Sequence, residues 1–314
     1  MIPYNWIEEA AERIAPHIRQ TPLSYDADND LYLKWENQQV TGSFKARGAF
    51  NKVLSLQDWE RQAGLVTASA GNHGQGVALA GQKVGAPVVV FASQHATPAK
   101  IEAMRGLGAE VRLVAGGYGE AEQAGLDFAR QNGLTWVSPY NDGQVIAGQG
   151  TLGREILRQQ PALRQATWII PAGGGGLACG IGAATQLPDD APRPALLAVS
   201  SEASPFLHAL YHRGTQADVV EYPSLADGLA GPVEAGSVTI PLARTYLHDF
   251  ILVSEAEIAS AIVYAWQHYD QKIEGSAAVA LAAALYQHVT ARPAVVILTG
   301  GNIQPELFQQ LVGG

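Results

Sequence analysis

Residues 168–179 read Trp-Ile-Ile-Pro-Ala-Gly-Gly-Gly-Gly-Leu-Ala-Cys, an apolar run that passes through four glycines into a second apolar stretch. A short run without polar positions is typical of a strand that is covered on both faces. Consecutive glycines leave their backbone N–H groups unshielded, and at the start of a helix such groups form a site for a phosphate-sized anion. A tight turn alone needs only one glycine. The stretch therefore predicts a buried parallel strand, a phosphate-binding turn and a helix.

Similar apolar runs recur along the chain and alternate with segments of helical length. They lie at residues 31–35, 65–68, 87–92, 110–114, 134–137, 168–171, 196–200 and 295–299. Strand–helix alternation of this kind predicts parallel sheets covered by helices, so we expect an α/β, doubly wound fold. Near the N-terminus, Asn5 and Glu8 have the spacing of a capping box and predict the start of a helix.

Length and composition exclude several classes of protein. The 314 residues suffice for two domains with a large core, and the net charge of −9 argues against nucleic acid or an anionic membrane as partner. The single cysteine, Cys179, excludes a disulfide framework and any multi-cysteine metal site. The N-terminus lacks a signal-peptide core, and the longest apolar stretch, residues 277–285, is too short to span a bilayer. We expect a soluble, cytoplasmic protein.

Three further glycine-rich turns, at residues 42–48, 69–74 and 299–302, carry polar side chains. Ligands of open α/β sheets bind beyond the carboxyl ends of the strands, so we expect all four turns to converge on one edge of the sheet. In the first turn, Lys45 adjoins Phe44, and a lysine held near an apolar ring with a lowered pKa can form a Schiff base with an aldehyde. The turn at 69–74 offers N–H groups at a helix start that suit a carboxylate, whereas His73 alone is more often structural.

The tetraglycine turn also permits a different ligand. Gly173, Gly175 and Ala178 fit the loose dinucleotide fingerprint, and Glu202 ends a strand about one βαβ unit later. On these residues alone an NAD-binding oxidoreductase remains open, although it leaves Lys45 unexplained. A nucleotide P-loop is excluded, because no Lys-Ser/Thr pair closes the glycines.

Taken together, the four turns resemble the fold type II pyridoxal-phosphate enzymes (tryptophan synthase β-like), and among these the threonine/serine dehydratase branch that includes serine racemase. The matching motifs are Gly-Ser-Phe-Lys-Ala-Arg-Gly-Ala at 42–49, Ser-Ala-Gly-Asn-His-Gly at 69–74, Gly-Gly-Gly-Gly-Leu at 173–177 and Thr-Gly-Gly-Asn at 299–302, with shorter matches at 145–151, 225–229 and 274–277. The resemblance implies two doubly wound parallel-sheet domains. Residues 1–48 and 143–314 would form a large domain that binds pyridoxal 5'-phosphate, and residues 49–142 a small mobile domain. It also implies a homodimer.

The resemblance further implies a role for each matching position. Lys45 would be the Schiff-base lysine and the base that removes the Cα proton of the substrate. The cofactor would be held by Phe44, Lys45, Asn72, Gly173, Gly174, Gly175, Gly176, Leu177, Gly228 and Thr299. The substrate carboxylate would be enclosed by Ser69, Ala70, Gly71, Asn72 and His73. Thr299 would face the pyridine nitrogen with a neutral hydroxyl, which favours β-elimination over transamination.

The implied reaction converts L-threonine to 2-oxobutanoate and ammonia, and L-serine to pyruvate. Serine racemase, dehydratases of hydroxyaspartate or other β-hydroxy amino acids, and synthases of the threonine or cysteine kind remain as alternatives with the same cofactor. The racemases that this chain resembles have a serine at the position of Ala70, and this serine serves as a second proton carrier. Ala70 cannot take that role, so we expect slow racemisation.

Two features of related enzymes are expected to be missing. Racemase-like members place a second acid six residues after the position of Glu202, and here that position is His208, so we expect no metal site. The chain ends at Gly314, soon after the last motif, and we expect no C-terminal regulatory domain.

Overall fold

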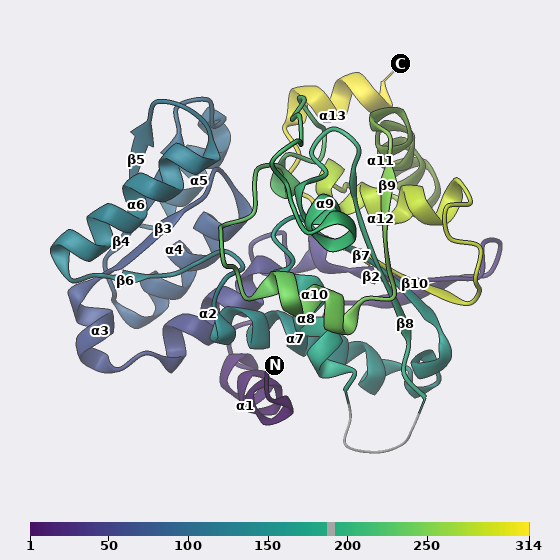
Figure 1. The fold of residues 1–314 in the computed structure, drawn as a ribbon, viewed down its shortest axis with the longest axis horizontal. Helices are drawn as coiled ribbons and strands as arrows, with labels where there is room; N and C mark the ends of the chain where they lie inside the picture. The colour runs from purple at the N-terminus through teal and green to yellow at the C-terminus, as the bar shows by residue number, and fades with distance from the viewer. Residues whose placement is uncertain (187–191, 314) are drawn as a thin grey trace.

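The computed structural model describes residues 1–186 and 192–313, which form two α/β units around separate sheets. The larger sheet has the order β1-β2-β10-β7-β8-β9, built from Leu23–Asp26, Leu31–Trp35, Ala294–Leu298, Thr167–Pro171, Ala195–Ser201 and Asp249–Val253. The smaller sheet has the order β5-β4-β3-β6, built from Glu110–Val114, Val88–Ser93, Leu65–Ala68 and Thr135–Trp136. Figure 1 shows the smaller sheet at the left and the larger sheet at the right.

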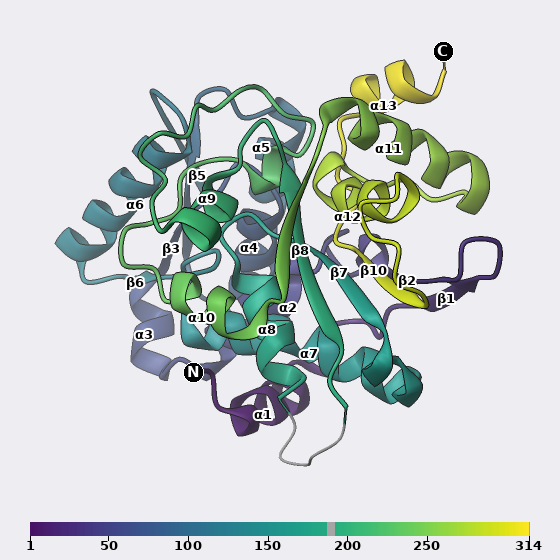
Figure 2. The same ribbon diagram turned by 45° about the vertical axis from the view of Figure 1, so that its right-hand side comes forward.

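Helices surround both sheets, as the two views of the ribbon show (Figures 1 and 2). Those with at least one turn of α-helix are α1 (Tyr4–Ile14), α2 (Lys45–Ser55), α3 (Asp58–Ala63), α4 (Asn72–Val84), α5 (Pro98–Gly106), α6 (Tyr118–Asn132), α7 (Gly143–Gln159), α8 (Gly176–Ala184), α9 (Phe206–Arg213), α10 (Thr239–Tyr246), α11 (Glu255–Tyr269), α12 (Gly275–Leu285) and α13 (Pro305–Val312). Among the described residues, no helix is long and apolar enough to cross a membrane.

Alternating side chains of the buried strands explain why both faces of each sheet are covered. In β7, Trp168 and Ile170 pack into one hydrophobic cluster with residues of α7 and α8, while Ile169 packs into the cluster formed with α11 and α12. In the smaller sheet, Leu65 of β3 packs with residues of α2 and α4, and Val66 packs with residues of α6. Strands with two apolar faces are stable only between two layers of helices, which gives the doubly wound architecture.

All eight expected strands are present, each within two residues of the predicted bounds, and the α/β fold class is confirmed. Two strands were not expected. β9 lies at one edge of the larger sheet, and β1 lies at the other edge, antiparallel to β2. The predicted capping box is wrong, because α1 begins at Tyr4 after Pro3 and Asn5 lies inside the helix, where it donates to Glu9.

The smaller sheet falls within residues 49–142, and the strands of the larger sheet fall outside them. The division into a large domain and a small mobile domain at these bounds stays a prediction. α2 crosses the expected boundary, since it begins at Lys45 and packs against both α4 and α7.

Candidate active site

A cavity of about 570 Å³ lies where the carboxyl ends of strands from both sheets meet. All the residues predicted to bind cofactor or substrate line it, namely Phe44, Lys45, Ser69, Ala70, Gly71, Asn72, His73, Gly173, Gly174, Gly175, Gly176, Leu177, Gly228 and Thr299. The expectation that the four turns meet at one edge of one sheet is wrong, because the turn at 69–74 follows β3 of the smaller sheet. The turns converge instead on a cavity shared by the two sheets.

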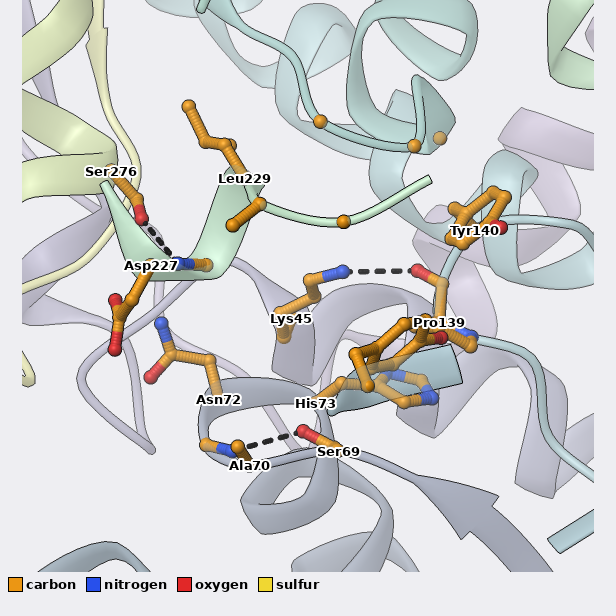
Figure 3. Close-up of a pocket in the computed structure, with 18 of the residues that line it drawn as sticks. Lys45, Ser69, Ala70, Asn72, His73, Pro139, Tyr140, Asp227, Leu229 and Ser276 are labelled. Carbon is orange, nitrogen blue, oxygen red and sulfur yellow. Dashed lines mark hydrogen bonds between the residues drawn. The ribbon is translucent and has the colours of Figure 1, made fainter. Parts of the chain in front are cut away.

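Lys45 is the first residue of α2, and its side chain borders the cavity (Figure 3). Its Nζ donates a 3.0 Å hydrogen bond to the carbonyl oxygen of Pro139 and lies 5.4 Å from the centre of the Phe44 ring. Burial lowers the pKa of Lys45 from its usual 10.5 to about 8, and the nearby carboxylate of Glu274 opposes this shift. A neutral amine is the nucleophile toward a carbonyl, so this lysine is activated close to neutral pH.

The tetraglycine turn joins β7 to α8 and is tightly packed on both sides. Gly175 has a φ of +86°, which favours glycine, and precedes the first residue of α8. A Cβ added at Gly174 would lie 2.4 Å from the Tyr140 ring, and one added at Gly173 would lie 2.7 Å from the Cα of Leu229. The N–H groups in the first turn of α8 have no intrahelical partner, so the turn offers donors to an anion.

The loop at 69–73 leads from β3 into α4, and its backbone is organised by Ser69, whose Oγ accepts from the N–H of Gly71 at 3.1 Å. The imidazole of His73 is buried, and its Nε2 donates to the carbonyl oxygen of Val137 at 3.1 Å. Burial, with a smaller contribution from the charge of Lys45, lowers the pKa of His73 to about 3, so the ring is neutral. A neutral ring with its proton on Nε2 cannot donate from Nδ1, which leaves the N–H groups at the start of α4 to bind a carboxylate.

The remaining predicted residues belong to two sets of hydrogen bonds. The side chain of Asn72 donates to Glu274 at 2.6 Å and accepts from Asn302 at 2.7 Å. The N–H of Gly228 donates to Ser276 Oγ at 2.9 Å (Figure 3). Thr299 donates to the carbonyl oxygen of Ser276 at 3.4 Å, a long bond that leaves its hydroxyl able to rotate toward a ligand.

Five charged residues that line the cavity were not predicted as site residues, namely Lys100, Glu120, Glu221, Asp227 and Glu274. Lys100 of α5 pairs with Asp227 at 2.6 Å, so a residue beside the smaller sheet bonds one from the larger unit. Glu274 is 4% exposed, and its burial, with a smaller contribution from Asp227, raises the pKa of its carboxyl to about 7. Asp227 and Glu274 lie in the family motifs at 225–229 and 274–277, so the sequence could have indicated them as site residues, whereas Lys100 lies in no motif.

The family of the chain follows from comparison with known proteins. The sequence profile of the family described as pyridoxal-phosphate dependent enzyme matches residues 11–300. The chain belongs to this family. The family, its cofactor and the fold type II architecture are therefore confirmed, and the NAD-binding alternative is set aside. Glu202, on which that alternative depended, is exposed and does not line the cavity.

Similar family members include an L-threonine ammonia-lyase of Thermotoga maritima, 37% identical over 319 residues, which cover 99% of this chain and 78% of the relative. That of Geobacter sulfurreducens is 38% identical over 320 residues, with the same 99% and 78% coverage. Among solved structures, maize serine racemase has a TM-score of 0.88 at 29% identity and covers 98% of this chain and 96% of its own. Threonine deaminase isoform 2 of Solanum lycopersicum has a TM-score of 0.88 at 28% identity, and the match covers 99% of this chain and 92% of the deaminase chain.

The cavity of this pyridoxal-phosphate enzyme fits its cofactor. An activated amine at Lys45 suits an aldehyde, and the glycine turn before α8 suits a phosphate, because any added Cβ would displace its neighbours. No such fit is found for a metal. The described residues contain no group of three or more His, Cys, Asp or Glu side chains placed to hold a metal ion.

Proposed function

We propose that this chain is a pyridoxal-phosphate-dependent threonine/serine ammonia-lyase. It converts L-threonine to 2-oxobutanoate and ammonia, and L-serine to pyruvate and ammonia, by β-elimination. The observation that carries the proposal is that Lys45, whose pKa is lowered, the tetraglycine turn and the loop at 69–73 share one cavity. The ammonia-lyase relatives at 37% and 38% identity support threonine as the substrate.

We assign the cofactor to residues of the larger unit together with Asn72 at the start of α4. The N–H groups at 173–177 hold its phosphate, Phe44 packs against its ring, and Thr299 places a neutral hydroxyl at its ring nitrogen. Gly228 lets the backbone come close to the reacting atoms. When bound, the cofactor withdraws electrons from Cα of an amino acid and so makes the Cα–H bond acidic.

The substrate lies between the cofactor-binding residues and the loop at 69–73, and the N–H groups of this loop bind its carboxylate. Lys45 then removes the proton from Cα, which requires a neutral amine near neutral pH. The electrons of the Cα–H bond form the Cα–Cβ double bond while the Cβ–O bond breaks, and the hydroxyl takes up a proton and leaves as water. The released enamine tautomerises, water adds to it, and ammonia departs to leave the 2-oxo acid.

A racemase is the second candidate, because maize serine racemase is among the similar structures. Racemisation needs a proton carrier on the face of Cα opposite the lysine. The loop at 69–73 lines the cavity opposite the tetraglycine turn and contains Ala70. Racemases that resemble this chain have a serine at this position, whereas the methyl group of Ala70 cannot exchange a proton. Elimination is therefore the favoured outcome.

The test combines a substrate panel with a lysine variant. The holoenzyme is assayed with L-threonine, L-serine, D-serine and 3-hydroxyaspartate for 2-oxo acid release, and the residual amino acid is analysed for chirality. We expect release from L-threonine and L-serine, and a loss of at least about a thousandfold in Lys45→Ala. Lys52→Ala is the matched control, since Lys52 lies on the same helix but pairs with Asp142 outside the cavity. Full turnover by Lys45→Ala would overturn the proposal.

We also propose a cytoplasmic homodimer whose residues 49–142 close over the substrate. The resemblance to fold type II enzymes supports this assembly and this motion. Light scattering of the purified holoenzyme tests the dimer, and cell fractionation tests the compartment. Small-angle scattering with and without L-serine tests closure, which predicts a smaller radius of gyration when substrate is bound.

A further inference from the structure

Asn302 ends the motif at 299–302, and its role is not explained by the assignments above. Its side-chain nitrogen donates two hydrogen bonds, one to the backbone carbonyl of Thr41 at 2.8 Å and one to Oδ1 of Asn72 at 2.7 Å. A carbonyl oxygen can only accept, so the bond to Thr41 fixes which end of the Asn302 amide carries the nitrogen. The same nitrogen therefore faces Asn72 as a donor.

The orientation of the Asn302 amide also determines the orientation of the Asn72 amide. Because its Oδ1 accepts from Asn302, its Nδ2 must point the other way, and it donates to Oε1 of Glu274 at 2.6 Å. Turning the Asn72 amide over would set two nitrogens against each other on one side and two oxygens on the other. Amide orientation is assigned by such networks, and here both neighbours favour the same orientation.

Two glycines provide the space for this arrangement. A Cβ at Gly300 would lie 2.4 Å from Oε1 of Glu274, and a Cβ at Gly42 would lie 2.6 Å from Oδ1 of Asn302. Gly42 also has a φ of +72°, which favours glycine. The turns at 42–48 and 299–302 thus bring the two partners of Asn72 to opposite ends of its amide.

We propose that Asn302 and Glu274 are positioning residues that hold the Asn72 amide so that it presents an N–H, and never its carbonyl oxygen, to the cofactor ring. The ring carries an oxygen substituent beside the aldehyde carbon, and an oxygen that is ionised there needs a donor. Nδ2 of Asn72 has a second hydrogen besides the one given to Glu274, and Asn72 lines the cavity. The inference rests on cofactor binding in this cavity and does not depend on which amino acid is the substrate.

The two positioning residues predict different effects of substitution. Asn302→Ala removes the bond that fixes the amide, and Asn302→Asp places an acceptor against the oxygen of Asn72. Glu274→Leu removes the acceptor at the other end, whereas Glu274→Gln keeps an acceptor oxygen there. The order of cofactor affinity should be parent, then Glu274→Gln, then Asn302→Ala and Glu274→Leu, and last Asn302→Asp.

The experiment titrates each apoprotein with pyridoxal phosphate and records both the dissociation constant and the visible absorption maximum. We expect Asn302→Ala to bind about tenfold more weakly with a shifted maximum, and Asn302→Asp to bind more weakly still. Asn51→Ala is the control, because Asn51 is buried and bonded at both ends, to Arg13 and Gln144, but lies outside the cavity. An Asn302→Ala protein that matches the parent and this control in affinity and spectrum would overturn the proposal.

A double variant guards against loss of folding. In Asn72→Asp combined with Glu274→Gln, the new carboxylate at position 72 accepts from Asn302 and from the new amide at position 274. All these hydrogen bonds can form, but position 72 has no donor left for the cofactor. We expect the parent's unfolding temperature with an affinity lowered at least about tenfold, and an unchanged affinity contradicts the proposal. Failure of the proposed function would look different, since the parent would bind the cofactor and release no 2-oxo acid.

Discussion

The amine of Lys45 lies 3.0 Å from the carbonyl oxygen of Pro139, a residue 94 positions further along the chain. Pro139 follows β6, where the chain leaves the smaller sheet, while Lys45 begins the helix that packs against both units. The hydrogen bond keeps the amine at the cavity wall, where burial lowers its pKa. The position of one backbone carbonyl therefore contributes to where the lysine amine is held.

The first prediction concerns the reactivity of this amine in the apoprotein. Only the neutral amine reacts with an acylating reagent, so the labelling rate of Lys45 should reach half its maximum near pH 8, well below the 10.5 of an ordinary lysine. Mass spectrometry of peptides labelled briefly at pH 6 to 11 measures the rate, with Lys52 as the internal reference. A midpoint near 10.5 at Lys45 contradicts the prediction.

The second prediction concerns the stability of the apoprotein. Between pH 8 and 10.5 the unfolded chain binds more protons at Lys45 than the folded chain, so the free energy of unfolding of the parent rises with pH across this range. Lys45→Met lacks the group and should be more stable at pH 7, by at most about 3 kcal/mol, because the side chain borders an open cavity.

Urea unfolding of the two apoproteins at pH 7, 8, 9 and 10 tests this prediction. The advantage of Lys45→Met should shrink as the pH rises toward 10.5. The other titrating groups are common to both proteins and cancel in the difference. A difference in unfolding free energy between the two proteins that stays constant with pH would show that the charge of Lys45 does not destabilise the folded protein.

The third prediction separates the two contacts of the phosphate-binding turn. Gly174→Ala pushes a methyl group into the Tyr140 ring, and Gly173→Ala pushes one into the backbone of Leu229. Both should weaken cofactor binding by at least about tenfold, because the turn must move. Adding Tyr140→Ala should recover part of the loss in Gly174→Ala and none in Gly173→Ala.

Cofactor titration of the four apoproteins measures these effects. Gly106→Ala is the matched control, because a Cβ added there meets no atom within 4 Å and the residue lies in α5, outside the cavity. It should bind the cofactor as the parent does. Equal recovery of both glycine variants by Tyr140→Ala would argue against the packing described here.

The fourth prediction concerns the choice between elimination and racemisation. Ala70 lines the cavity together with Lys45 and carries no exchangeable proton. The parent should form D-serine from L-serine slowly, and Ala70→Ser should raise that rate relative to pyruvate release. Chiral chromatography with a pyruvate assay gives the ratio, and Ala70→Gly serves as the control without a hydroxyl. A ratio in Ala70→Ser no higher than in Ala70→Gly rejects this view of the loop.

Much of the fold was predictable because its buried strands are apolar on both faces. The run at residues 168–171 and the glycines after it predicted a strand, a turn and a helix, and all three are present as β7, the turn and α8. The two edge strands were missed for different reasons. β1, Leu23–Asp26, is largely exposed and mixes polar with apolar residues. β9, Asp249–Val253, contains the apolar run Phe-Ile-Leu-Val at 250–253, a signal that could have identified it.

The predicted site residues all line one cavity, but their geometry could not be derived from spacing. The pairing of Lys100 with Asp227 joins residues far apart in the sequence that have no local pattern in common. The neutral state of His73 likewise depends on its burial and on the nearby charge of Lys45, which only the packed structure brings together. Pair contacts of this kind are set by the tertiary arrangement and not by periodicity.

The cavity draws its two walls from two separately packed cores. The tetraglycine turn and Phe44, which we propose to hold the cofactor, pack with one core, while the loop at 69–73, which we propose to receive the amino acid, leads into a helix of the other. Substitutions at Ser69, Ala70 or Gly71 can therefore reshape substrate choice while Asn72, Pro139 and Tyr140, which contact the cofactor side of the cavity, are kept. Changes in one short loop thus give a single scaffold an evolutionary route to new amino-acid specificities.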